Sequence, residues 1–121
     1  KYFGTTAHLI DPDIDSGSII DIKRFKLKSK ITLQEIINKT KFCQYNQAVE
    51  ILEKIFKNPK NIRNMTKKYN KVKWSNKILK QIDLEKIYTL KLKDLNNMSK
   101  SEIIRYFRAT VISNYFPKIQ I

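Results

Sequence analysis

The stretch that decides the fold is FGTTAHLIDPDIDSGSIIDIKRFKL, residues 3–27. Its two ends, 3–10 and 18–27, are rich in β-branched and apolar residues, and the second alternates apolar with charged side chains, which is typical of β-strands. Residues 11–17 are turn formers, too many for a two-residue hairpin turn. The pattern predicts two strands joined by a shaped loop, in which Gly17 is free to take a positive φ.

The sequence after these strands is mainly helical in pattern. Thr32 and Glu35 form a T-x-x-E capping box, and an amphipathic pattern follows it as far as residue 57. Residues 60–75 are polar and basic without a clean period, so we expect an extended surface segment there. A short helix is expected at 76–82, and a second capping box at 99–102 opens another. The β-branched and aromatic end, residues 109–121, favours a turn or a strand edge.

Composition and charge exclude several classes of protein. The 121 residues include one cysteine and one histidine, which rules out a disulfide framework, a zinc ribbon or a multi-histidine metal centre. Two glycines cannot build a dinucleotide or P-loop phosphate cradle. No apolar run approaches the roughly 18 residues of a membrane-spanning helix, so the expected location is cytoplasmic. Cys43 lies close to the apolar stripe of the first helix, where we expect a small buried side chain.

A net charge of +14 raises the question of nucleic-acid binding. Only four of the 25 basic residues are arginines, although base readers usually prefer the bidentate arginine fork. The lysines are interspersed with isoleucine and asparagine, a bias that A/T-rich codons explain. We therefore expect a solvated basic surface, part of which can attract a phosphorylated small substrate, and no nucleic-acid partner.

Three carboxylates, those of Asp11, Asp13 and Asp15, crowd into the loop between the strands. Their repulsion is unfavourable unless solvent, hydrogen-bond donors or a cation offsets it, and as turn residues in water they need no ligand. The spacing is similar to a calcium loop, but Ser16 and Ile22 occupy the positions of the required glycine and glutamate. We expect no metal site, with Asp15 directed into a cleft and the other two in solvent.

Residues 4–20, GTTAHLIDPDIDSGSII, resemble the signature of the folate-dependent formyltransferases. The resemblance covers seventeen consecutive residues and implies an α/β fold with a Rossmann-like mixed sheet. It implies transfer of a formyl group from 10-formyltetrahydrofolate to an amine, with an asparagine, a histidine and an aspartate assisting the attack. The aspartate corresponds to Asp15, which would orient the imidazole, stabilise its cation and help to move the proton of the amine.

The resemblance also implies binding of the pterin ring by the loop, largely through backbone groups of Ile10, Asp11, Pro12, Asp13 and Ile14. His8 matches a strand position, so we expect it to pack or to form a hydrogen bond. The catalytic asparagine and histidine of the family belong to an N-x-H-x-S motif some thirty residues before Gly4. We therefore expect the 121 residues to be the C-terminal part of a longer enzyme, and to be inactive alone.

A second, shorter similarity concerns residues 103–110, IIRYFRAT, followed by Tyr115-Phe116-Pro117, and it indicates the bacterial sugar N-formyltransferases. Those enzymes formylate amino groups of nucleotide-linked sugars. The implied organisation is a catalytic portion at 1–57 and a helical or extended C-terminal extension at 58–121 that mediates homodimerisation. Exposure of the first strand's edge would also favour self-association.

Two further readings stay open. One is a methionyl-tRNA formyltransferase, which the net charge of +14 favours, but such an enzyme would continue into a C-terminal β-barrel. The other is a non-catalytic basic binding module, in which the aspartate loop would have only a structural role. Arg108 could pair with a phosphate, although a structural salt bridge is the expected role. Trp74 and Tyr69 could stack on a nucleotide base, although packing within the protein is the expected role.

Overall fold

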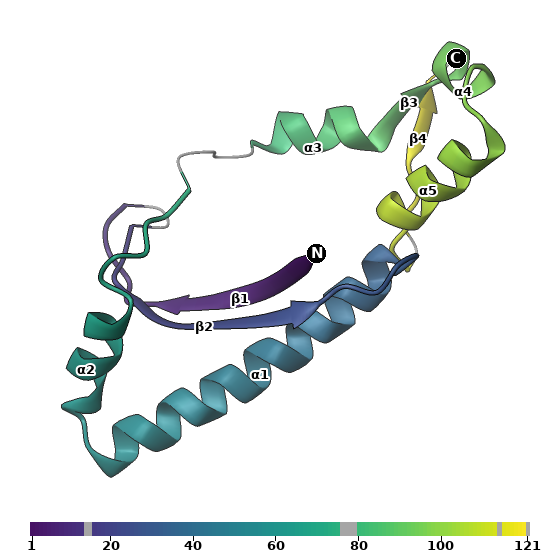
Figure 1. Cartoon of the computed structure of the whole chain (residues 1–121). Coiled ribbons are helices and arrows are strands. Elements are labelled where there is room, and N and C mark those ends of the chain that lie inside the picture. The colour runs from purple at the N-terminus through teal and green to yellow at the C-terminus, as the bar shows by residue number, and fades with distance from the viewer. Residues whose placement is uncertain (14–15, 76–79, 114, 121) are drawn as a thin grey trace. The chain divides into compact units, whose positions relative to one another are not determined.

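The computed structural model describes residues 1–13, 16–75, 80–113 and 115–120, and it is a mixed α/β protein. The chain divides into two compact units. The first comprises Lys1–Leu27 and Asn38–Asn76, and the second comprises Lys28–Ile37 and Lys77–Ile121. We call them the hairpin unit and the C-terminal unit. The elements in chain order are β1 Tyr2–His8, β2 Ile19–Lys26, α1 Leu33–Lys57, α2 Asn61–Lys68, α3 Gln81–Tyr88, β3 Thr89–Lys91, α4 Leu92–Asn96, α5 Lys100–Thr110 and β4 Lys118–Gln120 (Figure 1).

The two predicted strands are present and pair with each other. β1 and β2 form an antiparallel two-stranded sheet in which Tyr2 lies opposite Lys26, and the register shifts at a bulge between Ala7 and His8. Ile19 and Ile20 of β2 are the buried apolar side chains of this unit among the described residues. The α/β class is therefore confirmed, while the larger Rossmann-like sheet stays a prediction.

Gly17 is needed for a different reason from the one predicted. Neither glycine has a positive φ. A Cβ at Gly17 would instead overlap with the carbonyl oxygen of Leu9 and lie 2.8 Å from the carbonyl carbon of that residue. The loop closes so tightly on the end of β1 that only a residue without a side chain fits.

The predicted long helix is α1, and three polar contacts attach it to the sheet. The Thr32 capping box is formed, since the Glu35 amide donates to Thr32 Oγ1 at 3.1 Å and Glu35 Oε2 accepts from the Thr32 amide at 2.8 Å.

The three contacts with the sheet lie further along α1. Thr5 Oγ1 lies 3.4 Å from Cys43 Sγ, and Gln47 Nε2 donates to Asp21 at 2.9 Å. Lys23 forms an ion pair with Glu50. Cys43 is half-buried, while Gln47 is almost fully buried.

The extended segment predicted at 60–75 is wrong for its first part, which is α2. Its less exposed side chains include Ile62, Met65 and Thr66, followed by Tyr69 just after the helix. They follow the helical spacing i, i+3, i+4, i+7. This short helix contacts β2, and residues 72–75 continue without regular structure.

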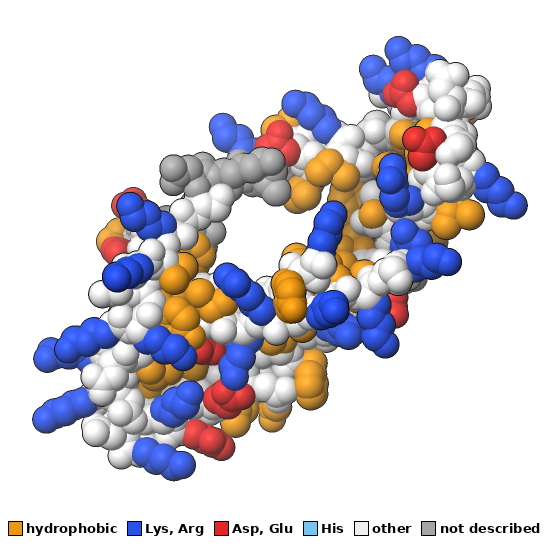
Figure 2. All heavy atoms as spheres, viewed as in Figure 1, with side chains coloured by type: hydrophobic (Ala, Val, Ile, Leu, Met, Phe, Trp, Pro, Cys, Tyr) orange, Lys and Arg blue, Asp and Glu red, His pale blue; other side chains and the backbone are white. Residues whose placement is uncertain are grey.

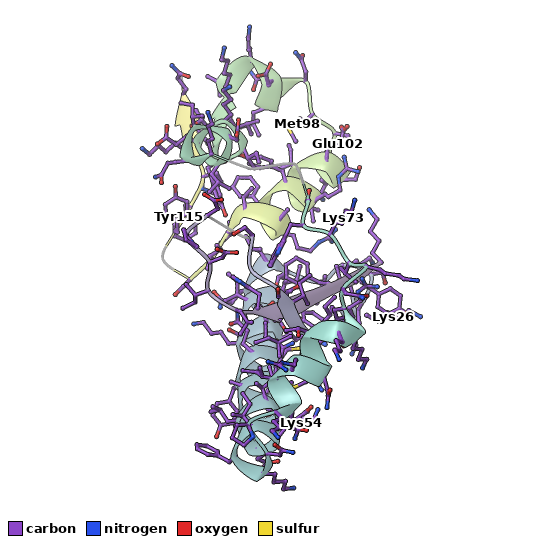
Figure 3. The ribbon with its side chains drawn as sticks, turned by 90° about the vertical axis from the view of Figure 1, so that its left-hand side faces the viewer. Lys26, Lys54, Lys73, Met98, Glu102 and Tyr115 are labelled. Carbon is purple, nitrogen blue, oxygen red and sulfur yellow. The ribbon has the colours of Figure 1, made fainter. Side chains whose placement is uncertain are left out.

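The C-terminal unit is built around a second small sheet, in which β3 and β4 pair in parallel. The predicted helix at 99 is α5, and its Ser99 and Glu102 form the expected capping box; Figure 3 labels Glu102 at the start of this helix. Tyr106 of α5 donates from its hydroxyl to the Ile87 carbonyl at 2.9 Å, and Tyr88 meets Tyr115 edge to face.

The helix predicted at 76–82 is covered only in part by the described residues. Residues 76–79 lie outside them, and helix α3 begins at Gln81.

Candidate functional site

The loop that joins β1 to β2 is the candidate site. The Leu9 amide donates to the Ser18 carbonyl at 2.9 Å and closes the base of the loop. Ile10 is 97% exposed, and Asp11, Pro12 and Asp13 are exposed as well. Ser16 Oγ donates to the Asp13 carbonyl at 2.8 Å across the loop. The two remaining residues of the predicted site, Ile14 and the predicted catalytic Asp15, lie outside the described residues.

Trp74 anchors the base of this loop. Its indole N–H donates to the Gly17 carbonyl at 3.0 Å, and its ring meets the His8 imidazole edge to face with the centroids 4.8 Å apart. The Nδ1 atom of His8 lies 2.8 Å from the Leu9 carbonyl oxygen. His8 and Trp74 therefore pack and form hydrogen bonds within the protein, as predicted, and together they hold both ends of the loop.

A hollow of about 360 Å³ lies beside the second half of the loop. Its polar wall comes from two segments far apart in sequence, and comprises Ser16, Ser18, Thr66, Lys67, Tyr69, Asn70 and Trp74. Hydroxyl, amide and ammonium groups thus surround an aromatic ring, a combination that can bind a polar ring compound or a phosphorylated one. The volume falls in the range of about 300–1,000 Å³ that is usual for small-molecule pockets.

One carboxylate fixes the position of the wall of this hollow. Asp21 of β2 accepts hydrogen bonds from Tyr69 Oη at 3.1 Å and from Gln47 Nε2 at 2.9 Å. It therefore joins α2 and α1 to the same point of the sheet. Lys23, on the same strand, donates a hydrogen bond to Glu50 of α1, and this contact raises the pKa of the Lys23 ammonium group above its ordinary value.

The residues from α2 were not part of the predicted site. Thr66, Tyr69 and Asn70 belong to residues 60–75, which were predicted to be an extended surface segment. The signal that could have found them is the helical spacing of Ile62, Met65, Thr66 and Tyr69, which repeated lysines and asparagines obscure. Tyr69 itself was predicted to pack within the protein, and its hydrogen bond to Asp21 confirms this.

Two observations concern charged groups among the described residues. No three histidine, cysteine or acidic side chains within those ranges come close enough to hold a metal ion. Arg108 of α5 is half-buried and forms no ion pair with any residue that the structure describes, so the expected structural salt bridge is not observed there.

Lysine and arginine side chains are visible at many points on the face shown in Figure 2. Within the described ranges, none of the helices combines the length and the apolar run that crossing a membrane requires.

In comparisons with known proteins, no family model, no curated protein and no solved structure matches this chain.

Proposed function

We propose that these residues form the C-terminal part of a folate-dependent formyltransferase that acts on the amine of a nucleotide-linked amino sugar. The supporting observation is the close contact between Gly17 and the Leu9 carbonyl, which explains in steric terms why the motif has a glycine at this point. The closed loop leaves Ile10, Asp11, Pro12 and Asp13 in solvent, free to contact a ligand through their backbone groups.

The proposed reaction forms one C–N bond and breaks another. The amine nitrogen of the sugar attacks the formyl carbon of 10-formyltetrahydrofolate, and the bond from that carbon to N10 of the folate breaks. The amine loses one proton, N10 gains one, and tetrahydrofolate leaves. Asp15 assists the proton transfer and stabilises a cationic imidazole, a role that typically contributes roughly 10²–10⁴-fold in rate.

The imidazole and the asparagine of this mechanism come from an N-x-H-x-S motif that the 121 residues do not contain. The single histidine, His8, is already engaged with Leu9 and Trp74. We therefore expect no turnover from these residues alone. The complete reading frame should encode the motif about thirty residues before Gly4, and its absence there would contradict the proposal.

The hollow beside the loop is the proposed place for part of the substrate. Lys67, Asn70 and the Ser18 hydroxyl offer donors to a phosphorylated sugar, and the indole of Trp74 offers an apolar surface. Because the chain has one tryptophan and it forms part of this wall, its fluorescence reports on occupancy. Titration with a nucleotide-linked amino sugar should change the emission to saturation, and the free nucleotide and the free sugar should bind more weakly.

Methionyl-tRNA formyltransferase is the second candidate, and the net charge of +14 is the observation that favours it. The described residues after the hairpin are mainly helical, with two three-residue strands, where that enzyme would have a β-barrel. Tight tRNA binding that weakens steeply with salt would support this candidate. Weak binding of tRNA, with formylation of the nucleotide sugar, would support the first.

A further inference from the structure

One face of α1 carries a narrow apolar stripe that is turned away from the sheet. Its members are exposed aromatic and aliphatic side chains: Phe42, Tyr45, Val49, Leu52 and Phe56, with exposed fractions of 69%, 69%, 37%, 50% and 83%. Spacings of three and four residues alternate along the stripe, which is the a/d pattern of helices that pack against each other. At about 100° per residue the five side chains fall within an arc of about 80°.

The opposite face of the same helix contacts the sheet and is the more polar one. Cys43, Gln47 and Glu50 make the contacts with Thr5, Asp21 and Lys23 described above. Most of the stripe therefore lies away from the face of α1 that contacts β1 and β2, and only Phe42, at its edge, adjoins β2 by lining a hollow with Phe25. Hydrophobic side chains are visible along this helix in Figure 2. A continuous apolar face of this kind on a charged protein marks an interaction surface.

The charges that flank the stripe indicate what covers it. Lys39 precedes Phe42 by three residues and Glu53 directly follows Leu52. At about 100° per residue, both side chains border the stripe on the same side of the helix. Neither has an ion-pair partner among the described residues. Residues 39–56 hold three lysines and two glutamates, so this segment has a net charge of +1 in a chain of net charge +14. Such a near-neutral face does not select an acidic partner.

We infer that α1 pairs antiparallel with α1 of a second copy of this chain. With Tyr45 of one copy beside Val49 of the other, Phe42 faces Leu52, and the two-fold symmetry makes every contact twice. In this register Lys39 and Glu53 of opposite copies lie on the same flank, about 3 Å apart along the axis, two residues' rise. Two complementary ion pairs then border one apolar seam.

A hollow of about 560 Å³ adjoins one end of the stripe and is lined in part by Phe25, Phe42 and Cys43. In the antiparallel arrangement Phe56 of the second copy comes to this end. Phe56 is the most exposed member of the stripe, and an aromatic side chain seated in such a hollow is the kind of residue that dominates interface energy. The proposed dimer therefore uses α1, and the separate prediction that residues 58–121 mediate dimerisation stays a prediction.

Sedimentation equilibrium of the 121-residue chain tests the inference. We expect a monomer–dimer equilibrium that Leu52→Asp abolishes. Lys39→Glu or Glu53→Lys places like charges opposite each other twice and should weaken the dimer about tenfold. The double variant restores the complementary pairs with their signs exchanged, so its dissociation constant should return to within about threefold of the original.

The matched control is Lys54→Glu, the same change of charge on the same helix but outside the stripe and its flanks; Figure 3 labels Lys54 on α1. It should leave the dissociation constant within about threefold, because it alters only long-range repulsion. All the substituted side chains are exposed, and unchanged circular dichroism would show that each variant folds. A chain that stays monomeric, or a double variant weaker than both single variants, would overturn the inference.

Discussion

Replacing Gly17 by alanine tests whether the tight closure of the loop is a requirement of the fold. The added Cβ would overlap with the Leu9 carbonyl oxygen, lie 2.8 Å from the Leu9 carbonyl carbon and approach His8 Nδ1 to 3.1 Å. Two of these three neighbours are backbone atoms, which cannot move without opening the base of the loop. The Leu9–Ser18 hydrogen bond of 2.9 Å and the Trp74–Gly17 bond of 3.0 Å both depend on that closure.

Two opposing effects set the magnitude. Alanine restricts the unfolded chain and by itself would stabilise the protein by about 0.4–1 kcal/mol, because Gly17 has no positive φ that alanine would be strained to adopt. Forcing an extra methyl group against packed atoms costs about 1–3 kcal/mol, and one weakened hydrogen bond adds about 1 kcal/mol. The net expectation is a loss of about 1–3 kcal/mol in the free energy of unfolding of the hairpin unit.

Urea unfolding followed by the fluorescence of Trp74 measures this loss at the site itself. Ser16→Ala is the matched control, since it removes one exposed hydrogen bond beside the glycine without adding an atom. It should cost no more than about 1 kcal/mol. Equal or greater stability of Gly17→Ala relative to the parent would show that the loop is not closed on Leu9, and would refute the steric reasoning.

Further predictions concern hydrogen bonds in both units. Tyr69→Phe removes the bond to Asp21 and should lower unfolding stability by about 0.5–1.5 kcal/mol in urea titrations, with no loss if α2 does not contact β2. Ser99→Ala removes the cap of α5 and should cost about 0.5–2 kcal/mol by thermal unfolding. Hydrogen bonds from Ser99 lower the pKa of Glu102 below its ordinary 4.5. The stabilising contribution of that carboxylate is therefore complete above pH 4.5 and disappears as the pH falls through the lowered pKa. Acid titration of helicity should show this change in the parent and a smaller one in Ser99→Ala, which keeps the hydrogen bond from the backbone amide of residue 99 to Glu102.

The elements that the sequence predicted correctly are those with local signals. The alternation of β2, the apolar period of α1 and the capping boxes at Thr32 and Ser99 each act within a few residues. α2 was missed because its apolar positions are few and separated by lysines and asparagines, so its helical form depends on contact with β2. Tertiary contacts of this kind are not visible in a local pattern.

The candidate site was predictable to a similar extent. The loop and its glycine are consecutive residues, so a motif could identify them. The anchoring bond from Trp74 to Gly17 spans 57 positions, and that from Tyr69 to Asp21 spans 48. Both depend on how α2 returns the chain to the sheet. The steric role of Gly17 was also hidden, because the neighbour that excludes a side chain is the backbone of Leu9.

The most direct test of the proposed function is the rate of formyl transfer from 10-formyltetrahydrofolate to a nucleotide-linked amino sugar. The assay uses the longer protein that the proposal expects, in which an N-x-H-x-S segment precedes these residues. Asp15→Asn should lower kcat by roughly 10²–10⁴-fold, while Asp94→Asn, an exposed aspartate on α4, leaves it unchanged. Equal rates for Asp15→Asn and the parent, or no formyl transfer by the complete protein, would contradict the account.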